Sequence, residues 1–169
     1  MKSVLISIRP EWCKKILTGE KTVEVRKTRP RLKTPFKVYI YCTLAASKEF
    51  KLDDRNWDVS ARNHGGWPDK RGRVIAEFAC DEIRRVHIPQ PAYQDKLDKR
   101  FIDESCLSYN SLHNYCPEGD AYFWHISDLK VYDEPKELET LTVLRETKFG
   151  YEPDEMQRAP QSWRYVEEL

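Results

Sequence analysis

The stretch of sequence that decides the fold is SIRPEWCKKILTGEKTVEVRKTRP, residues 7–30. Pro10 suits a first helical turn, and apolar residues then recur at helical spacing until Gly19, a favoured left-handed helix terminator. Beyond the glycine, Val23 and Val25 alternate with polar residues, which is typical of a strand that buries one face. The stretch therefore predicts a short helix, a glycine turn and a strand.

The polar face of this predicted strand carries the most distinctive side chains. Lys21 just precedes the strand, and Glu24 and Arg26 share one of its faces. We expect these three residues to converge with Ser7 and Arg9. A carboxylate between cations stays ionised and can accept hydrogen bonds from a nucleobase, while the cations meet phosphate or carbonyl oxygens. An ordinary charged surface is the open alternative.

Length and composition narrow the class of protein. The chain has 169 residues, which predicts one domain over 1–169. It has no run of about 20 apolar residues, and its start carries charges where a secretion signal would be apolar. Its five cysteines are odd in number and lack CxxC spacing, which favours reduced thiols. We therefore expect a cytoplasmic protein without a membrane span or a disulfide framework.

Charge is distributed unevenly along the chain. Residues 1–40 hold eleven Lys and Arg against three Asp and Glu, whereas residues 131–169 hold five against ten. Because attraction depends on local potential, the basic quarter can draw phosphate groups although the whole chain has a net charge of only +1. A solvated basic face that folds against the acidic tail is the open alternative.

The rest of the chain predicts more strands than helices. Further strands are expected at 4–8, with one apolar and one mixed face, and at 36–43, 73–88, 121–126 and 162–166; short helices are expected near 94–103 and 108–115. An irregular insertion is expected around 44–72 and a C-terminal extension at 133–169. This pattern predicts an α+β fold, built on a small mixed β-barrel with flanking short helices.

Aromatic residues offer a second group of candidates. Trp124 and His125 are neighbours on a predicted strand, so they point to opposite faces and at most one of them faces a cleft. A tryptophan in a cleft can stack on a base, although core packing is its commoner role. The same two possibilities stay open for Trp57 and Trp67 in the insertion.

The sequence gives little reason to expect a metal or another cofactor. Cys106, His113 and Cys116 lie close together, but their spacing matches no usual zinc module. Cys42 follows apolar residues, and nothing near it in sequence requires a lowered pKa. We expect these cysteines to pack, and we expect no metal site and no cofactor.

Residues 7–30 resemble the opening of the ASCH domain, whose mark is a GxKxxExR motif after a short helix. Here the motif reads Gly19, Lys21, Glu24 and Arg26. The resemblance extends to VYIYCT at 38–43, RVIAEFACDEI at 73–83, AYFWHISDLKVYDEPKEL at 121–138 and PQSWRYVE at 160–167. It implies a PUA-like fold, a small β-barrel with flanking helices and a cleft, and an association with RNA and modified nucleosides.

The first functional interpretation is a binding module for RNA or a modified nucleoside. The expected ligand-binding residues are Ser7, Arg9, Lys21, Glu24, Arg26, Trp124 and His125, and the expected contacts to the RNA backbone are Arg29, Arg31 and Lys33.

The second interpretation is an enzyme. One branch of the ASCH family resembles amidohydrolases that remove the acetyl group of acetylated cytidine with a lysine, a threonine and a glutamate. Lys21 matches that lysine, whereas Glu24 stands where the threonine nucleophile stands, so the catalytic residues would be Lys21 and Glu24, with Glu24 as a general base. A metal-dependent ribonuclease using His64 and Glu24, and a protein interaction domain, are further alternatives.

Overall fold

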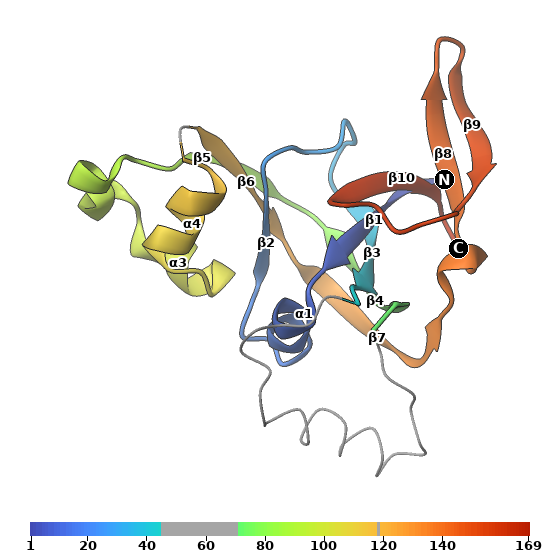
Figure 1. Cartoon of the computed structure of the whole chain (residues 1–169), viewed down its shortest axis with the longest axis horizontal. Coiled ribbons are helices and arrows are strands. Elements are labelled where there is room, and N and C mark those ends of the chain that lie inside the picture. The colour runs from blue at the N-terminus through green and yellow to red at the C-terminus, as the bar shows by residue number, and fades with distance from the viewer. Residues whose placement is uncertain (45–70, 118) are drawn as a thin grey trace. The chain divides into compact units, whose positions relative to one another are not determined.

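The computed structural model describes residues 1–44, 71–117 and 119–169, and it confirms the predicted α+β class (Figure 1). Its strands are β1 (Lys2–Ile8), β2 (Val23–Arg26), β3 (Phe36–Cys42), β4 (Arg73–Cys80), β5 (Ile83–His87), β6 (Asp120–His125), β7 (Ser127–Lys136), β8 (Thr142–Thr147), β9 (Gly150–Glu155) and β10 (Trp163–Glu167). Its helices are α1 (Pro10–Leu17), η1 (Pro91–Lys96), α3 (Lys99–Ser105), α4 (Tyr109–Tyr115) and η2 (Leu138–Thr140). No helix among these residues is long and apolar enough to cross a membrane.

The chain divides into two compact units. The first unit comprises Met1–Lys14, Lys37–Phe78 and Leu129–Leu169, and the second comprises Lys15–Phe36 and Ala79–Asp128. Each unit has its own sheet and its own apolar core. That the two units form one domain over 1–169 stays a prediction.

Strand pairing corrects the expected β-barrel. The described strands form a seven-stranded sheet in the order β7-β4-β3-β1-β10-β8-β9 and a three-stranded sheet in the order β2-β6-β5. A barrel closes only when its edge strands pair, and β9 is a charged, exposed strand interrupted by Pro153, as is typical of a strand that stays at an edge. Among the described residues, the larger sheet is therefore open, and the fold is a mixed α+β arrangement of two sheets.

The first strand lies at the centre of the larger sheet. It pairs with β3 in parallel, which brings Val4 beside Val38, and with β10 antiparallel, which brings Val4 beside Tyr165. Every residue from Ser3 to Ile8 is buried, so the expected mixed face is buried as well. A central strand covered on both faces reads as a continuous buried run.

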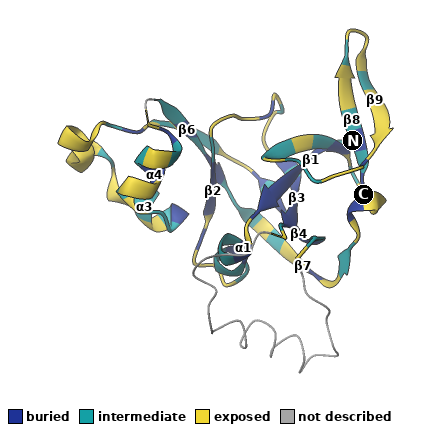
Figure 2. Ribbon diagram, in the orientation of Figure 1, coloured by how far each residue is buried: buried dark blue, intermediate teal, exposed yellow. Residues whose placement is uncertain are grey.

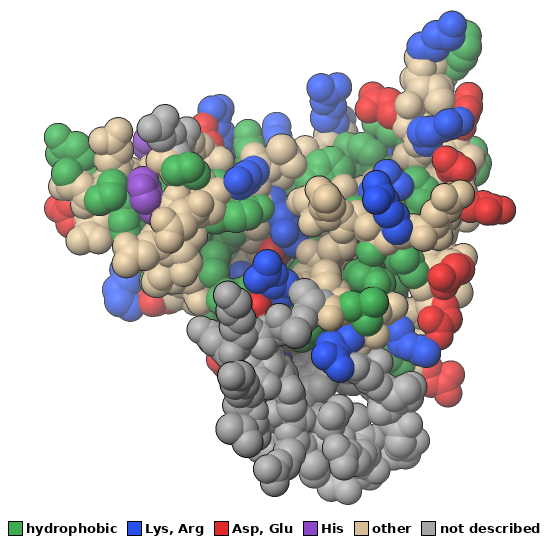
Figure 3. Space-filling view, viewed as in Figure 1, with side chains coloured by type: hydrophobic (Ala, Val, Ile, Leu, Met, Phe, Trp, Pro, Cys, Tyr) green, Lys and Arg blue, Asp and Glu red, His purple; other side chains and the backbone are tan. Residues whose placement is uncertain are grey.

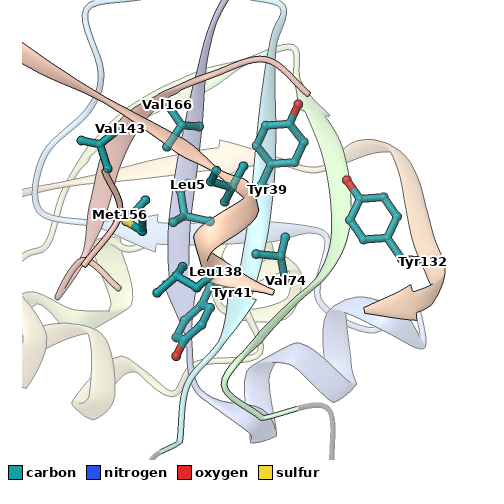
Figure 4. Packing of buried hydrophobic residues seen from close by; sticks show 10 residues of the cluster. Leu5, Tyr39, Tyr41, Val74, Tyr132, Leu138, Val143, Met156 and Val166 are labelled. Atoms are coloured by element: carbon teal, nitrogen blue, oxygen red, sulfur yellow. The ribbon is translucent and has the colours of Figure 1, made fainter. Parts of the chain in front are cut away.

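The first unit is held by an apolar cluster on its sheet (Figure 4). Its buried members are Leu5, Tyr39, Tyr41, Val74, Tyr132, Leu138, Leu141, Val143, Met156 and Val166. Tyr132 donates its hydroxyl hydrogen to Glu77 Oε2 at 2.5 Å, which satisfies a polar group at the edge of the cluster.

The second unit packs helices α3 and α4 against one face of its sheet. Val23 and Val25 are buried there, as predicted, together with Phe123 from β6. Figure 2 shows β2 coloured mainly as buried. The side chain of Asp98 caps α3 and that of Ser108 caps α4, each accepting a hydrogen bond from a backbone N–H in the first turn. One face of β2 therefore packs on helices, and its other face carries the polar side chains of the motif.

The elements differ from the predictions at several places, and the helix expected near 94–103 is divided into η1 and α3. The expected strand over 73–88 is split into β4 and β5, with a break at residues 81–82. The C-terminal extension holds strands that were not expected, above all the β8–β9 hairpin. Figure 3 shows charged side chains on this hairpin, and Phe149 at its tip is exposed. The sequence of the hairpin therefore lacks a clear period-2 alternation of apolar and polar residues.

Candidate functional site

Lys21 is held in place by three backbone contacts within the second unit. Gly19, with φ +78°, ends α1 as predicted, and its N–H donates to Ile16 O. The N–H of Lys21 then donates to Lys15 O at 3.0 Å, and the N–H of Thr22 donates to Glu104 O at 3.0 Å. The chain that enters β2 is therefore fastened both to the end of α1 and to α3.

Glu24 lies between two cations in the buried part of this unit. Its Oε2 is 3.5 Å from Lys21 Nζ, and its Oε1 is 3.2 Å from Arg26 Nη2. Lys21 is 2% exposed and Glu24 is 6% exposed, so the three charges are screened little by water. Glu24 Oε2 accepts no hydrogen bond from any described residue. Lys21, Glu24 and Arg26 therefore lie close together, as the sequence predicted.

The ammonium group of Lys21 has one strong acceptor from elsewhere in the chain. Lys21 Nζ donates to Ser105 O at 2.8 Å, at the end of α3. Burial lowers the pKa of Lys21 below its usual value of 10.5, and the neighbouring Glu24 carboxylate partly opposes that change. Burial and an opposite charge thus shift the pKa of the same amine in opposite directions, with burial the larger effect, which is a common arrangement at functional sites.

The neighbouring strand β6 places aromatic side chains beside these charges. In the antiparallel pair of β2 and β6, Glu24 is opposite Trp124 and Arg26 is opposite Tyr122. Opposite residues share one face of a sheet, so Trp124 and Tyr122 lie on the polar face of the motif. Trp124 is fully buried and meets Phe36 edge to face, with ring centroids 6.0 Å apart. Its predicted contact with a ligand stays a prediction, and its observed role is packing beside Glu24.

His125 lies on the opposite face from Trp124, as the alternation predicts. It is opposite Val23, and its Nδ1 is 2.7 Å from Asp81 Oδ1. This contact with His125 is the largest cause that lowers the pKa of Asp81. His125 is therefore an oriented, partly exposed side chain on the helix side of the sheet.

The remaining predicted residues are distributed over both units. Ser7 and Arg9 belong to the first unit, where Ser7 Oγ donates to Pro160 O at 2.6 Å; their convergence with Lys21 stays a prediction. Arg29, Arg31 and Lys33 belong to the second unit and are exposed in the loop that follows β2.

Other predictions concern the insertion and metal ligands. Trp57, Trp67 and His64 lie outside the described residues. Within residues 1–44, 71–117 and 119–169, no group of three or more His, Cys, Asp or Glu is placed to hold a metal ion. Cys42 and Cys116 are buried free thiols, and burial raises the pKa of Cys116.

Three contributors to the site were missed at the level of sequence. The Ser105 carbonyl is 84 residues from Lys21, Cys106 lies beside that carbonyl in a left-handed conformation with φ 55°, and Tyr122 is brought next to Arg26 only by strand pairing. The alternation in AYFWHI, which puts Tyr122 and Trp124 on one face, was the one available signal.

Comparison with solved structures identifies proteins whose fold is similar to that of this chain. The crystal structure of the ASCH protein from Zymomonas mobilis matches with a TM-score of 0.60 and 21% identity, over 98% of this chain and 87% of that one. A serine-to-alanine variant of that protein matches with a TM-score of 0.60 and 20% identity, over 98% and 88%. This chain has the ASCH fold. A tyrosine-to-phenylalanine variant matches with a TM-score of 0.60 and 21% identity, over 99% and 91%.

The predicted resemblance to ASCH domains is thus confirmed for the fold. No protein-family model matches the chain. A search of curated proteins gives no match either. Within the ASCH fold of this chain, the GxKxxExR residues lie on the turn and strand described above, at the start of the three-stranded sheet.

Proposed function

We propose that this protein binds RNA, or a modified nucleoside within RNA, through the polar site of Lys21, Glu24 and Arg26. The observation that carries the proposal is the buried carboxylate of Glu24, held between two cations with one oxygen that accepts no hydrogen bond from the described residues. Burying charges costs several kcal/mol per ion unless good contacts compensate, so a site of this kind suits a bound polar ligand.

The chemistry of the site matches the edge of a nucleobase. A carboxylate oxygen accepts hydrogen bonds from amino or imino groups, whereas lysine and arginine donate to carbonyl or phosphate oxygens. Ser7, Arg9 and Trp124 are the further residues proposed to contact the ligand. His125, which was expected among them, lies on the helix side of the sheet, on the opposite face from Glu24. The resemblance of the motif to that of ASCH domains, which are associated with RNA and modified nucleosides, adds support.

The first test compares the binding of nucleosides by the wild-type protein and by the variant Lys21→Met. We expect the wild-type protein to retain at least one member of a panel of modified ribonucleosides, and Lys21→Met to weaken that binding about 10- to 150-fold, the worth of one hydrogen bond to a charged group. Binding is measured by equilibrium dialysis with mass spectrometry. Lys99→Met, an exposed lysine of the same unit, is the matched control.

Two checks make this test decisive. Thermal unfolding establishes that Lys21→Met is folded, and Glu24→Gln, which keeps the shape of the side chain, repeats the test on the acceptor. If both site variants are folded and retain every nucleoside as the wild type does, the proposed site is wrong.

A second test concerns the basic loop. We expect affinity for a single-stranded oligoribonucleotide to fall steeply with salt, because each neutralised phosphate releases counterions. Replacing Arg29, Arg31 and Lys33 by glutamine should reduce the slope of log K against log salt by about 2, since each contact to a single strand contributes roughly 0.7. A slope that is unchanged in this variant would remove the loop from the interface.

A matched triple variant controls for total charge. Lys96, Lys99 and Arg100 are exposed basic residues on η1 and α3 in the same unit. Their replacement by glutamine removes the same three charges, and we expect it to leave the salt slope within error of the wild type.

The second candidate function is hydrolysis of an acylated cytidine. It is favoured by one observation, the burial of Lys21 beside Glu24, which lowers the pKa of the lysine. Glu24 would take a proton from water, and the hydroxide would attack the acyl carbonyl with Lys21 near the oxyanion. The protonated Glu24 would then return that proton to the leaving nitrogen as the C–N bond breaks, which gives a carboxylic acid and the free amine. A Lys21-dependent loss of an acyl mass during the first test would favour this function. The metal-dependent ribonuclease, which relies on His64, stays a prediction.

A further inference from the structure

We propose that Tyr122 on β6, flanked by Arg26 and Arg85, is a stacking platform for a second nucleotide of a single-stranded RNA, next to the base bound at Glu24. This inference rests on the proposed function, and it narrows the ligand from a free nucleoside to a segment of at least two nucleotides.

The register of the three-stranded sheet brings the three side chains together. Arg26 of β2 and Arg85 of β5 are both directly opposite Tyr122 of the central strand β6. Residues opposite one another in antiparallel strands share a face, with Cβ atoms about 4.5 to 5.5 Å apart. The register thus places Tyr122 between two arginines, whose guanidinium groups pair with carboxylates, Arg26 with Glu24 and Arg85 with Asp120.

This row lies on the face turned away from the core of the second unit. The neighbouring residues Val25 and Phe123 point the other way and are buried in the cluster under α3 and α4. Tyr122 is therefore not needed to fill that core. It is partly exposed, and the Arg85 side chain is 70% exposed.

Exposure increases from one row of this face to the next. The row of Glu24 and Trp124 is buried, whereas the row of Tyr122 and Arg85 reaches solvent. Arg85 is also fixed in orientation, because its Nε donates to Asp120 Oδ2 at 2.6 Å. Its Nη2 pairs with the same carboxylate, which leaves the planar face of the guanidinium for a ligand.

The spacing of the rows decides what ligand they fit. Residues 24 and 26 are two positions apart on β2, a rise of about 7 Å, whereas stacked bases are about 3.4 Å apart. Bases that reach both rows must therefore be unstacked from each other, which is the state in which single-stranded RNA is recognised on aromatic side chains. A double helix cannot meet this requirement.

Charge complementarity points to the same occupant. The basic loop with Arg29, Arg31 and Lys33 begins where β2 ends, directly after Arg26. We expect an RNA strand that stacks on Tyr122 to bring its phosphates towards that loop. Arginine beside an aromatic ring further strengthens stacking of a base.

The test compares two ligands on one variant. We expect Tyr122→Leu to weaken binding of a fluorescein-labelled single-stranded octaribonucleotide about 5- to 150-fold, the range measured for loss of one base stack. The same variant should bind a single nucleoside as the wild type does. Tyr122→Phe, which keeps the ring, should retain most of the affinity, and Tyr93→Leu, an exposed tyrosine of the same unit, should change nothing.

The outcomes separate the platform from the site at Glu24. If Tyr122→Leu is folded and binds the octaribonucleotide as tightly as the wild type, while Lys21→Met does not, the platform is wrong and the proposed function stands. If the wild type binds neither RNA nor nucleoside, the proposed function fails and the platform fails with it. Ultraviolet crosslinking followed by mass spectrometry should add a nucleotide mass to Tyr122, and its appearance on Tyr93 alone would contradict the platform.

Discussion

Replacing Glu24 by alanine is expected to lower the free energy of unfolding by about 3 to 5 kcal/mol, the usual cost of removing one partner from a buried ion pair. Glu24 is the carboxylate that faces both Lys21 and Arg26, and neither cation has much access to water. Without it, two buried positive charges remain side by side. Urea unfolding monitored by tryptophan fluorescence measures the change.

Two further variants test whether charge is the cause. Glu20→Ala removes an exposed carboxylate that lies 3.8 Å from Lys15, and it should cost no more than about 1 kcal/mol. The double variant Lys21→Met with Glu24→Leu removes charge of both signs and should recover much of the lost stability. If Glu24→Ala costs no more than Glu20→Ala, the site is not the buried, charge-coupled cluster described here.

The pH dependence of the Glu24→Ala variant follows from the pKa of Lys21. Burial lowers this pKa below its usual 10.5 and Glu24 raises it, so the variant must lower it further. Between the folded pKa and 10.5, the unfolded chain binds more protons than the folded one, and stability rises with pH. The gap in stability between the variant and the wild type should therefore narrow as the pH becomes alkaline.

Much of the site could be predicted from sequence because its centre is local. Gly19, Lys21, Glu24 and Arg26 lie within eight residues, and a turn followed by an alternating strand fixes how they face one another. The burial of Val23 and Val25 follows from the same alternation. The local alternation of residues was therefore sufficient to predict both the strand and its polar face.

The parts that could not be predicted depend on pairing between distant segments. The Ser105 carbonyl reaches Lys21 across 84 residues, and Arg85 joins Tyr122 through the register of β5 and β6. No pattern within a single segment encodes such a register. Strand order also depends on pairing between distant segments. For this reason the sequence predicted a barrel, whereas the structure has an open seven-stranded sheet.

Replacing Phe123 by alanine should cost about 3 to 5 kcal/mol, because its ring is fully buried against Phe101 at the centre of the second unit and leaves a cavity. Leu5→Ala, in the core of the first unit, should cost about 2 to 5 kcal/mol for the same reason.

The two variants together test the expectation of one domain. If the units unfold cooperatively, both substitutions move a single transition, and amide exchange speeds up in both units of each variant. Phe149→Ala, on the exposed hairpin tip, should change stability by less than about 0.5 kcal/mol and serves as the control. Two transitions, with each variant moving only its own, would instead mean that the two sheets fold independently and that the polar site of Lys21, Glu24 and Arg26 belongs to a unit stable by itself.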